Sequence, residues 1–237
     1  MTEHAGIEDL INDLVTANHI LYHEGVVDGF GHVSVRHPTR ADRFLLSRSI
    51  APGKVKAEDI MEFDLDGNPV DPRGRKPYLE RFIHSEVYRV RADVQSVVHN
   101  HSPAVIPFGV TNAPMQPISH MSGFLAGGVP NFEIRDAGGP TTDMLIRTPQ
   151  LGKAAFALMR GHGAVAVGDS IRQVVYRAVY AEQNARLQAE ALRLTAATGG
   201  GEINFLNDAE AAGAEAANYA AMDRPWELWK TRVAQQK

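Results

Sequence analysis

The sequence predicts a single α/β domain built in three layers. Two observations carry this prediction: short apolar runs typical of strands recur along the chain, and longer stretches between them show the 3.6-residue spacing of amphipathic helices. At 237 residues the chain is long enough to bury one full core, and we find no internal repeat or low-complexity linker that would divide it. We therefore expect one domain over residues 1–237, ending in a helical tail from about residue 207.

The first half of the chain is predicted to combine two helices with a set of strands. Apolar side chains at helical spacing define the first helix, which the glycine-flanked Phe30 ends. Asp66-Gly67-Asn68-Pro69 is a strong hairpin-turn sequence after the third strand. In order, the predicted elements are a helix over 6–26, strands over 32–36, 44–47 and 60–65, a helix from about 79 to 90, and a strand over 94–99.

The second half is predicted to be mostly helical. Residues 113–143 are rich in Gly, Pro and Met. Ser170 is a suitable N-cap for the longest helix, and the glycines at 199–201 end that helix. In order, the predicted elements are a short helix beginning within 103–108, a strand near 131–134, a helix over 150–159, a strand over 164–167, a helix over 170–197, and a helical tail over 207–232 whose Trp226 and Trp229 pack the tail down or cap a neighbour's pocket.

Composition excludes several classes of function. The formal net charge of -4 and the absence of a Lys/Arg cluster argue against a nucleic-acid partner. No apolar run approaches the roughly 20 residues that cross a membrane, and the acidic, amphipathic N-terminus does not resemble a signal peptide, so we expect a cytoplasmic protein. The chain has no cysteine, which leaves His, Asp and Glu as metal ligands and catalytic groups.

Three histidines predict a metal site. His99 and His101 lie two residues apart at the end of an apolar strand, so both imidazoles project from one face. His162 lies between two glycines just before another apolar run. Three neutral imidazoles around an open position are typical of a catalytic divalent-metal site rather than a closed structural one.

Glu80 is the fourth candidate. It begins the helix that leads into the strand of His99, and His84 lies one turn further on the same face. Three interpretations of Glu80 are open. It binds the metal, or it acts as an acid/base whose pKa is raised in a dry pocket. Alternatively, it is a solvated residue at the start of a helix, where the helix dipole favours a carboxylate. His84 either contacts the substrate or positions Glu80.

Four sequence blocks together resemble the class II aldolase/adducin family, over roughly residues 8 to 195. They are Gly31-His32-Val33-Ser34-Val35-Arg36, Glu80-x-x-x-His84-x-x-x-Tyr88-x-x-Arg91-x-Asp93-Val94, His99-Asn100-His101-Ser102-Pro103 and Arg160-Gly161-His162-Gly163. The resemblance implies an αβα sandwich around a mostly antiparallel sheet, and a tetramer with active sites between subunits. It also implies that His99, His101 and His162 bind a divalent metal and that Glu80 is an acid/base or a metal contact.

The departures from the sugar-phosphate members of that family point to a different substrate. Those members carry Gly-Asn-x-Ser where this chain has Gly31-His32-Val33-Ser34, and a Ser-Ser pair where it has Tyr78-Leu79. Because a phosphate dianion needs several donors, the loss of these small polar groups argues against a phosphosugar. A flat aromatic carboxylate tolerates the added apolar wall.

These substitutions, with Leu46-Ser47-Arg48, resemble the branch of decarboxylases that act on dihydroxyphthalate and hydroxymethylpyridine-dicarboxylate. We therefore expect a metal-dependent decarboxylase of a hydroxylated aromatic or pyridine carboxylate, with the metal chelating a ring hydroxyl and a carboxylate, and Glu80 as proton donor. The predicted substrate contacts are His32, Ser47, Arg48, Tyr78 and His120, although Arg48 is as well explained by a surface ion pair.

Three other functions stay open. The first is an aldolase acting on a non-phosphorylated hydroxy-keto acid with the same metal and Glu80. The second is an iron oxygenase, and the third is a non-catalytic assembly module like the domain of adducin, which would lack the ligands that this chain retains. Imidazole with a nearby carboxylate suits several ions, which we rank Mn²⁺ first and Zn²⁺ next, with Fe²⁺ or Co²⁺ following.

Overall fold

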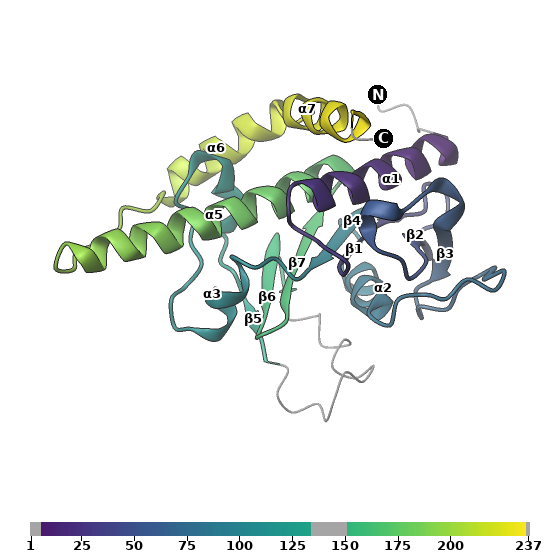
Figure 1. The fold of residues 1–237 in the computed structure, drawn as a ribbon, viewed down its shortest axis with the longest axis horizontal. Coiled ribbons are helices and arrows are strands. Elements are labelled where there is room, and N and C mark those ends of the chain that lie inside the picture. The colour runs from purple at the N-terminus through teal and green to yellow at the C-terminus, as the bar shows by residue number, and fades with distance from the viewer. Residues whose placement is uncertain (1–5, 134–150, 236–237) are drawn as a thin grey trace.

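The chain folds around a seven-stranded sheet of order β3-β2-β1-β4-β7-β6-β5 (Figure 1). A computed structural model describes residues 6–133 and 151–235. Every neighbouring pair in this sheet is antiparallel except β5 and β6, which are parallel. The strands are β1 (His32–Arg36), β2 (Arg43–Ser47), β3 (Ile60–Asp64), β4 (Ser96–Asn100), β5 (Asn131–Phe132), β6 (Phe156–Met159) and β7 (Gly163–Gly168).

Helices cover both faces of the sheet, as Figure 1 shows. On one face α1, α5 and α7 pack together, with α5 against β4 and β7; on the other face α2 packs against β4. The predicted αβα sandwich with a mostly antiparallel sheet is therefore confirmed. The helices are α1 (Ile7–His23), α2 (Arg81–Val90), α3 (Ile106–Val110), α5 (Ile171–Ala197), α6 (Asp208–Ala220) and α7 (Asp223–Ala234), with short 3-10 helices η1 (Pro52–Lys54), η2 (Ala57–Asp59) and η3 (His120–Leu125).

The alternation of side chains along the strands divides the core into two layers. In β4, Val98 belongs to the cluster under α1 and α5, whereas Val97 belongs to the cluster under α2. Residues two apart share a face, so His99 follows Val97 onto the α2 side. By the same rule, His32 and Ser34 of β1 face α2, because Val33 and Val35 lie in the other cluster. The face that carries the predicted site is thus the α2 face.

The helix predicted over 150–159 is wrong, because residues 156–159 form strand β6. Residue 150 lies outside the described residues, as does the end of the strand predicted near 131–134, of which 131–132 form β5. The four residues of β6 are buried on both faces, and a short run that is apolar throughout has no periodicity to separate a strand from a helix. Pairing with β7 decides the structure here.

The C-terminal tail folds as two helices instead of one. Pro225 stands in the first turn of α7 and cannot extend a helix from α6, since its ring would clash with the carbonyl of Ala221, four residues earlier. Trp226 and Trp229 are buried in the core under α1 and α5, which agrees with a packing role. Ser170 caps α5 as expected, accepting a hydrogen bond from the Gln173 N–H. Across residues 6–133 and 151–235, none of the helices has the length and apolar character needed to cross a membrane.

Candidate metal centre

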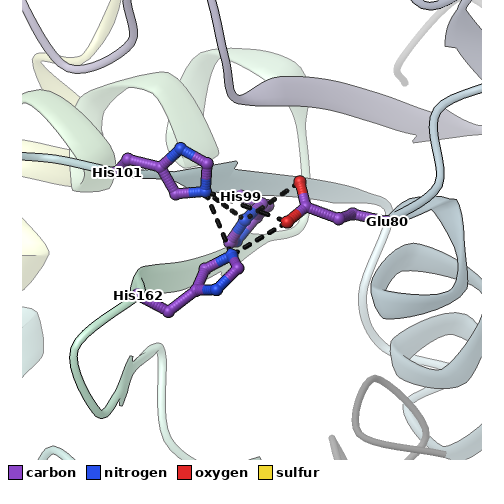
Figure 2. Close-up of side chains that lie close together, drawn as sticks. All are labelled: Glu80, His99, His101 and His162. Carbon is purple, nitrogen blue, oxygen red and sulfur yellow. Dashed lines mark hydrogen bonds and ion pairs between the residues drawn. The ribbon is translucent and has the colours of Figure 1, made fainter. Parts of the chain in front are cut away.

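Strand pairing brings the three predicted histidines to one point (Figure 2). His99 is the penultimate residue of β4 and His101 follows the strand, while His162 lies in the turn between β6 and β7. The β4–β7 ladder pairs Asn100 with Ala164, which places the His162 turn directly beside His101. The turn approaches β4 so closely that a Cβ at Gly163 would lie 1.9 Å from the Asn100 carbonyl oxygen.

The ring nitrogens converge in the way metal ligands do. The Nε2 atom of His101 lies 3.1 Å from Nε2 of His99 and 3.0 Å from Nε2 of His162. His99 Nδ1 donates to the carbonyl of Ala164 at 3.1 Å, so a neutral His99 has its lone pair on Nε2. Nitrogens bound to one ion at about 2.1 Å and at right angles to each other stand about 3.0 Å apart. The three imidazoles therefore fit adjacent positions around a single divalent ion.

Glu80 completes the cluster from the start of α2, where it is the N-cap residue (Figure 2). Its Oε1 lies 2.9 Å from His162 Nε2, and its Oε2 lies 3.5 Å from His99 Nε2. One ligand atom from each of the four residues falls within 4.8 Å of the others. Three imidazoles and one carboxylate can hold a divalent cation, or the three imidazoles can hold it while Glu80 stays free beside it.

The pKa of Glu80 shifts in the opposite direction from the upward shift considered in the sequence analysis. Burial raises this pKa, but the hydrogen bond with His162 and the nearby rings of His32 and His99 outweigh burial, so that the net shift is strongly downward. An Nε2 atom that binds a metal carries no proton, so neither His99 nor His162 can donate to Glu80 through Nε2 while it binds the ion. With a metal bound, His32 is the donor that stays available to Glu80. The pKa of His101 falls to about 4, first through burial and then through the neighbouring His99, so the ring is neutral at neutral pH.

Three of the predicted substrate contacts lie beside the centre. His32 sits opposite His99 in the β1–β4 ladder, and its Nε2 lies 3.4 Å from Glu80 Oε2. The ring of Tyr78 packs against the ring of His32 with 4.5 Å between centroids. Ser47 Oγ donates to the Tyr78 hydroxyl at 3.3 Å, and that hydroxyl donates to the carbonyl of Ile50. Together they form a polar and aromatic wall next to Glu80.

His84 is buried behind this wall, and its ring hydrogen-bonds His32 rather than Glu80. The non-helical backbone of Glu80, at the N-cap, turns its side chain toward the three histidines while His84 points into the core. In space, His32 thus lies between His84 and Glu80.

Arg48 and His120 lie elsewhere. Arg48 Nε donates to Asp59 Oδ1 at 2.6 Å, and both residues line a surface groove together with Asn12 of α1. His120 is exposed at the start of η3, which packs on α6 and α5. Within residues 6–133 and 151–235, the recorded contacts do not join either side chain to Glu80 or to the three histidines. Their substrate roles stay predictions.

Phe30 is a residue near the site that the sequence analysis used only to end a helix. Its side chain is 69% exposed, and its ring centroid lies 6.2 Å from that of His101. The backbone N–H of Phe30 donates to Asp28 Oδ1 at 2.8 Å, which fixes the turn that presents the ring. The signal in the sequence is an aromatic residue between Gly29 and Gly31, directly before the His32 block.

Comparison with known proteins agrees with this architecture. The chain is 38% identical to Decarboxylase tropJ of Talaromyces stipitatus, over 94% of this chain and 93% of that protein. It is 31% identical to the 3,4-dihydroxyphthalate decarboxylase of Arthrobacter keyseri, over 88% of this chain and 86% of that protein. The structure of L-fuculose 1-phosphate aldolase from Glaciozyma antarctica shares the fold with a TM-score of 0.78 at 20% identity, covering 96% of this chain and 91% of that one. The model of the Class II Aldolase and Adducin N-terminal domain family matches residues 12–189, and the chain belongs to this family.

Proposed function

We propose that the chain is a divalent-metal-dependent decarboxylase of a hydroxylated aromatic or pyridine carboxylate. The observation that carries this proposal is the convergence of Glu80 with three imidazole nitrogens, in a chain whose relatives include decarboxylases over nearly their full length. We rank Mn²⁺ first and Zn²⁺ next, because chelation by two substrate oxygens favours an ion whose coordination shell can expand.

His99, His101 and His162 would hold the ion. A divalent ion bound there supplies positive charge near the ring oxygens of the substrate, where electron density rises as CO₂ leaves. The bond between the ring carbon and the carboxylate carbon breaks, and its electron pair stays on the ring. Glu80, which is ionised in the resting site, would take up a proton from solvent and deliver it to that ring carbon, so that one proton is consumed for each CO₂ released.

The surroundings of Glu80 favour a flat substrate. Tyr78 and His32 form one wall with their rings in contact, and Phe30 stands exposed beside His101. Leu79, just before Glu80, is also exposed and apolar. We propose that an aromatic acid lies between these groups, with His32 and Ser47 near its polar substituents. Exposed apolar side chains at the edge of the site also support a homotetramer whose neighbouring subunit closes it.

Release of CO₂ tests the proposal directly. Metal-stripped protein is reconstituted with Mn²⁺, Zn²⁺ or Fe²⁺ and assayed on a panel of hydroxylated benzene and pyridine dicarboxylates, anaerobically and in air. We expect metal-restored CO₂ release that Glu80→Gln and His99→Ala abolish, while His23→Ala, on α1, leaves it unchanged.

Three outcomes would overturn the decarboxylase. A carbonyl product without CO₂ from hydroxy-keto acids would establish an aldolase, and product formation that needs O₂ would establish an oxygenase. Intact metal binding without turnover of any compound would favour a binding role.

A further inference from the structure

A buried set of hydrogen-bonding side chains leads inward from the metal centre. His32 and Ser34 project from β1 toward α2, because residues two apart on a strand share a face. His84 and Tyr88 project from α2 toward β1, because residues four apart on a helix share a face. All four side chains are at least 98% buried.

These four side chains form one continuous chain of short contacts. His32 Nδ1 lies 2.6 Å from His84 Nε2, His84 Nδ1 lies 2.6 Å from Ser34 Oγ, and Ser34 Oγ lies 2.8 Å from the Tyr88 hydroxyl. At its outer end, His32 Nε2 faces Glu80 Oε2 across 3.4 Å. The chain therefore runs from Tyr88, in the core, to the carboxylate beside the metal ligands.

Each ring in the chain carries one proton. His32 Nδ1 and His84 Nε2 lie 2.6 Å apart, so one proton lies between them, and the burial of both rings disfavours a charge on either. Burial raises the pKa of Tyr88, which keeps its O–H. A neutral imidazole has one N–H and one lone pair, and here both nitrogens of His84 and Nδ1 of His32 are engaged. The direction of one hydrogen bond consequently fixes the direction of the next.

The ends of the chain select one direction. The Glu80 carboxylate can only accept, so His32 Nε2 carries the proton that faces it, and His32 Nδ1 accepts from His84 Nε2–H. His84 Nδ1 then accepts from the Ser34 hydroxyl, which accepts in turn from Tyr88 O–H. Ser34 Oγ is the side-chain acceptor within reach of that O–H, so the inner end selects the same direction without Glu80. Every hydrogen bond in the chain points toward the metal centre.

His32 Nε2 is the buried atom at the outer end of this chain. It is completely shielded from solvent and makes no hydrogen bond within the described residues. Its 3.4 Å separation from Glu80 exceeds the 2.7–3.2 Å typical of an N–H···O hydrogen bond. A shift of the Glu80 carboxylate by a few tenths of an ångström would satisfy this donor, as would a substrate oxygen that takes the place of Glu80 Oε2.

We infer that Tyr88, Ser34 and His84 are positioning residues that hold His32 as the Nε2–H tautomer, so that it presents a fixed donor to a carboxylate or hydroxyl oxygen of the substrate. The catalytic part of this inference rests on the proposed function. The tautomer itself does not, because it is a property of the folded protein.

Nitrogen NMR of histidine tests the tautomer without any assay of activity. In ¹⁵N-histidine-labelled, Zn²⁺-loaded protein, long-range ¹H–¹⁵N spectra distinguish protonated from unprotonated ring nitrogens, and His32→Gln assigns the signals. We expect the His32 proton on Nε2. We also expect it to stay there in Glu80→Gln, where the carboxylate no longer selects it. A proton on Nδ1 in the native protein, or a mixture of tautomers in Glu80→Gln, would overturn the inference.

A second pair of variants tests the chain itself. In Glu80→Gln/His84→Leu we expect the signals of both tautomers, and Glu80→Gln/Ser34→Ala gives the same test should the first variant not fold. Glu80→Gln/His23→Leu is the matched control, and we expect it to keep a single tautomer. If the variants with His84→Leu and Ser34→Ala both keep a single Nε2–H tautomer, the buried hydrogen-bonding side chains do not set the tautomer of His32.

Kinetics then separates positioning from packing. We expect His84→Leu to lower kcat about 10- to 100-fold with unchanged metal content, as loss of outer hydrogen-bond partners does in metal sites. His84→Gln, whose amide can donate to His32 and accept from Ser34, should retain kcat within about threefold. Equal loss in both variants would refute the positioning role. If no CO₂ is released by any form, the proposed function fails while the NMR result still decides the tautomer.

Discussion

The turn that carries His162 offers a sharp test of the metal centre, because two glycines flank the ligand and only one of them is packed. A Cβ at Gly163 would lie 1.9 Å from the Asn100 carbonyl oxygen, whereas a Cβ at Gly161 would meet nothing closer than Val110 Cγ1 at 3.7 Å. Gly161 has φ +68°, so alanine there carries only the strain of a left-handed backbone. Gly163→Ala and Gly161→Ala therefore form a matched pair around one ligand.

The structure gives the size of the two effects. To accommodate alanine at 163, the turn and β4 must separate by about 1.5 Å to restore ordinary contact, and overpacking of this kind costs about 3 kcal/mol of unfolding free energy. A metal ligand tolerates displacement of only about 0.2 Å, so we expect the Kd for the metal to rise by about 100-fold or more. Gly161→Ala should cost about 1 kcal/mol through backbone strain and leave the Kd within about threefold.

Calorimetric metal titration and urea unfolding with and without Mn²⁺ measure both quantities. At a metal concentration 100 times the native Kd, binding stabilises the native protein by about 2.7 kcal/mol, and a 100-fold weaker variant gains only about 0.4 kcal/mol. If Mn²⁺ raises the unfolding free energy of Gly163→Ala as much as that of the native protein, the placement of His162 in the metal centre is refuted. Equal effects of the two substitutions would refute the role of the close approach to Asn100.

Three further predictions follow from single side chains. Phe30→Ala should raise KM for an aromatic substrate about 2- to 12-fold, the worth of one ring contact, with unchanged unfolding free energy; Leu228→Ala, exposed on α7, is the control, and an unchanged KM would remove Phe30 from the site. Because burial depresses the pKa of His84, the unfolded state binds the extra proton below about pH 6.5, so metal-free protein should lose stability as pH falls. His84→Gln should flatten this dependence by up to about 1.4 kcal/mol per pH unit in urea midpoints measured between pH 7 and 5.5, and parallel curves would contradict the assignment. Trp226→Ala should cost about 3–5 kcal/mol in unfolding free energy and leave metal affinity unchanged, whereas lost activity at unchanged stability would indicate a pocket cap instead.

Local rules were sufficient for much of the fold and for finding the candidate metal ligands. The spacing of His99 and His101 placed both rings on one strand face, and Ser170 and the hairpin turn at Gly67 mark element ends through contacts within a few residues. The segment 156–159 was predicted wrongly because its local pattern is the same for both kinds of structure. Its partner strand, which decides the outcome, is not part of the local pattern.

The environment of Glu80 shows what the sequence could not supply. Burial and the neighbouring histidines push its pKa in opposite directions, and their balance depends on distances across three separate elements. Phe30 likewise became a neighbour of His101 only through the packing of its loop against the end of β4.

By itself, the sequence determined which residues can serve as ligands, which family the chain resembles, and that His99 and His101 occupy one face of their strand. These follow from residue chemistry and from the fixed periods of strands and helices, which act over a few positions. Only the tertiary structure decided that His162 meets His101, that His84 reaches Glu80 through His32, and that four buried groups form one chain of hydrogen-bonding contacts. Such outcomes depend on strand pairing and on the removal of water, which join residues distant in the chain.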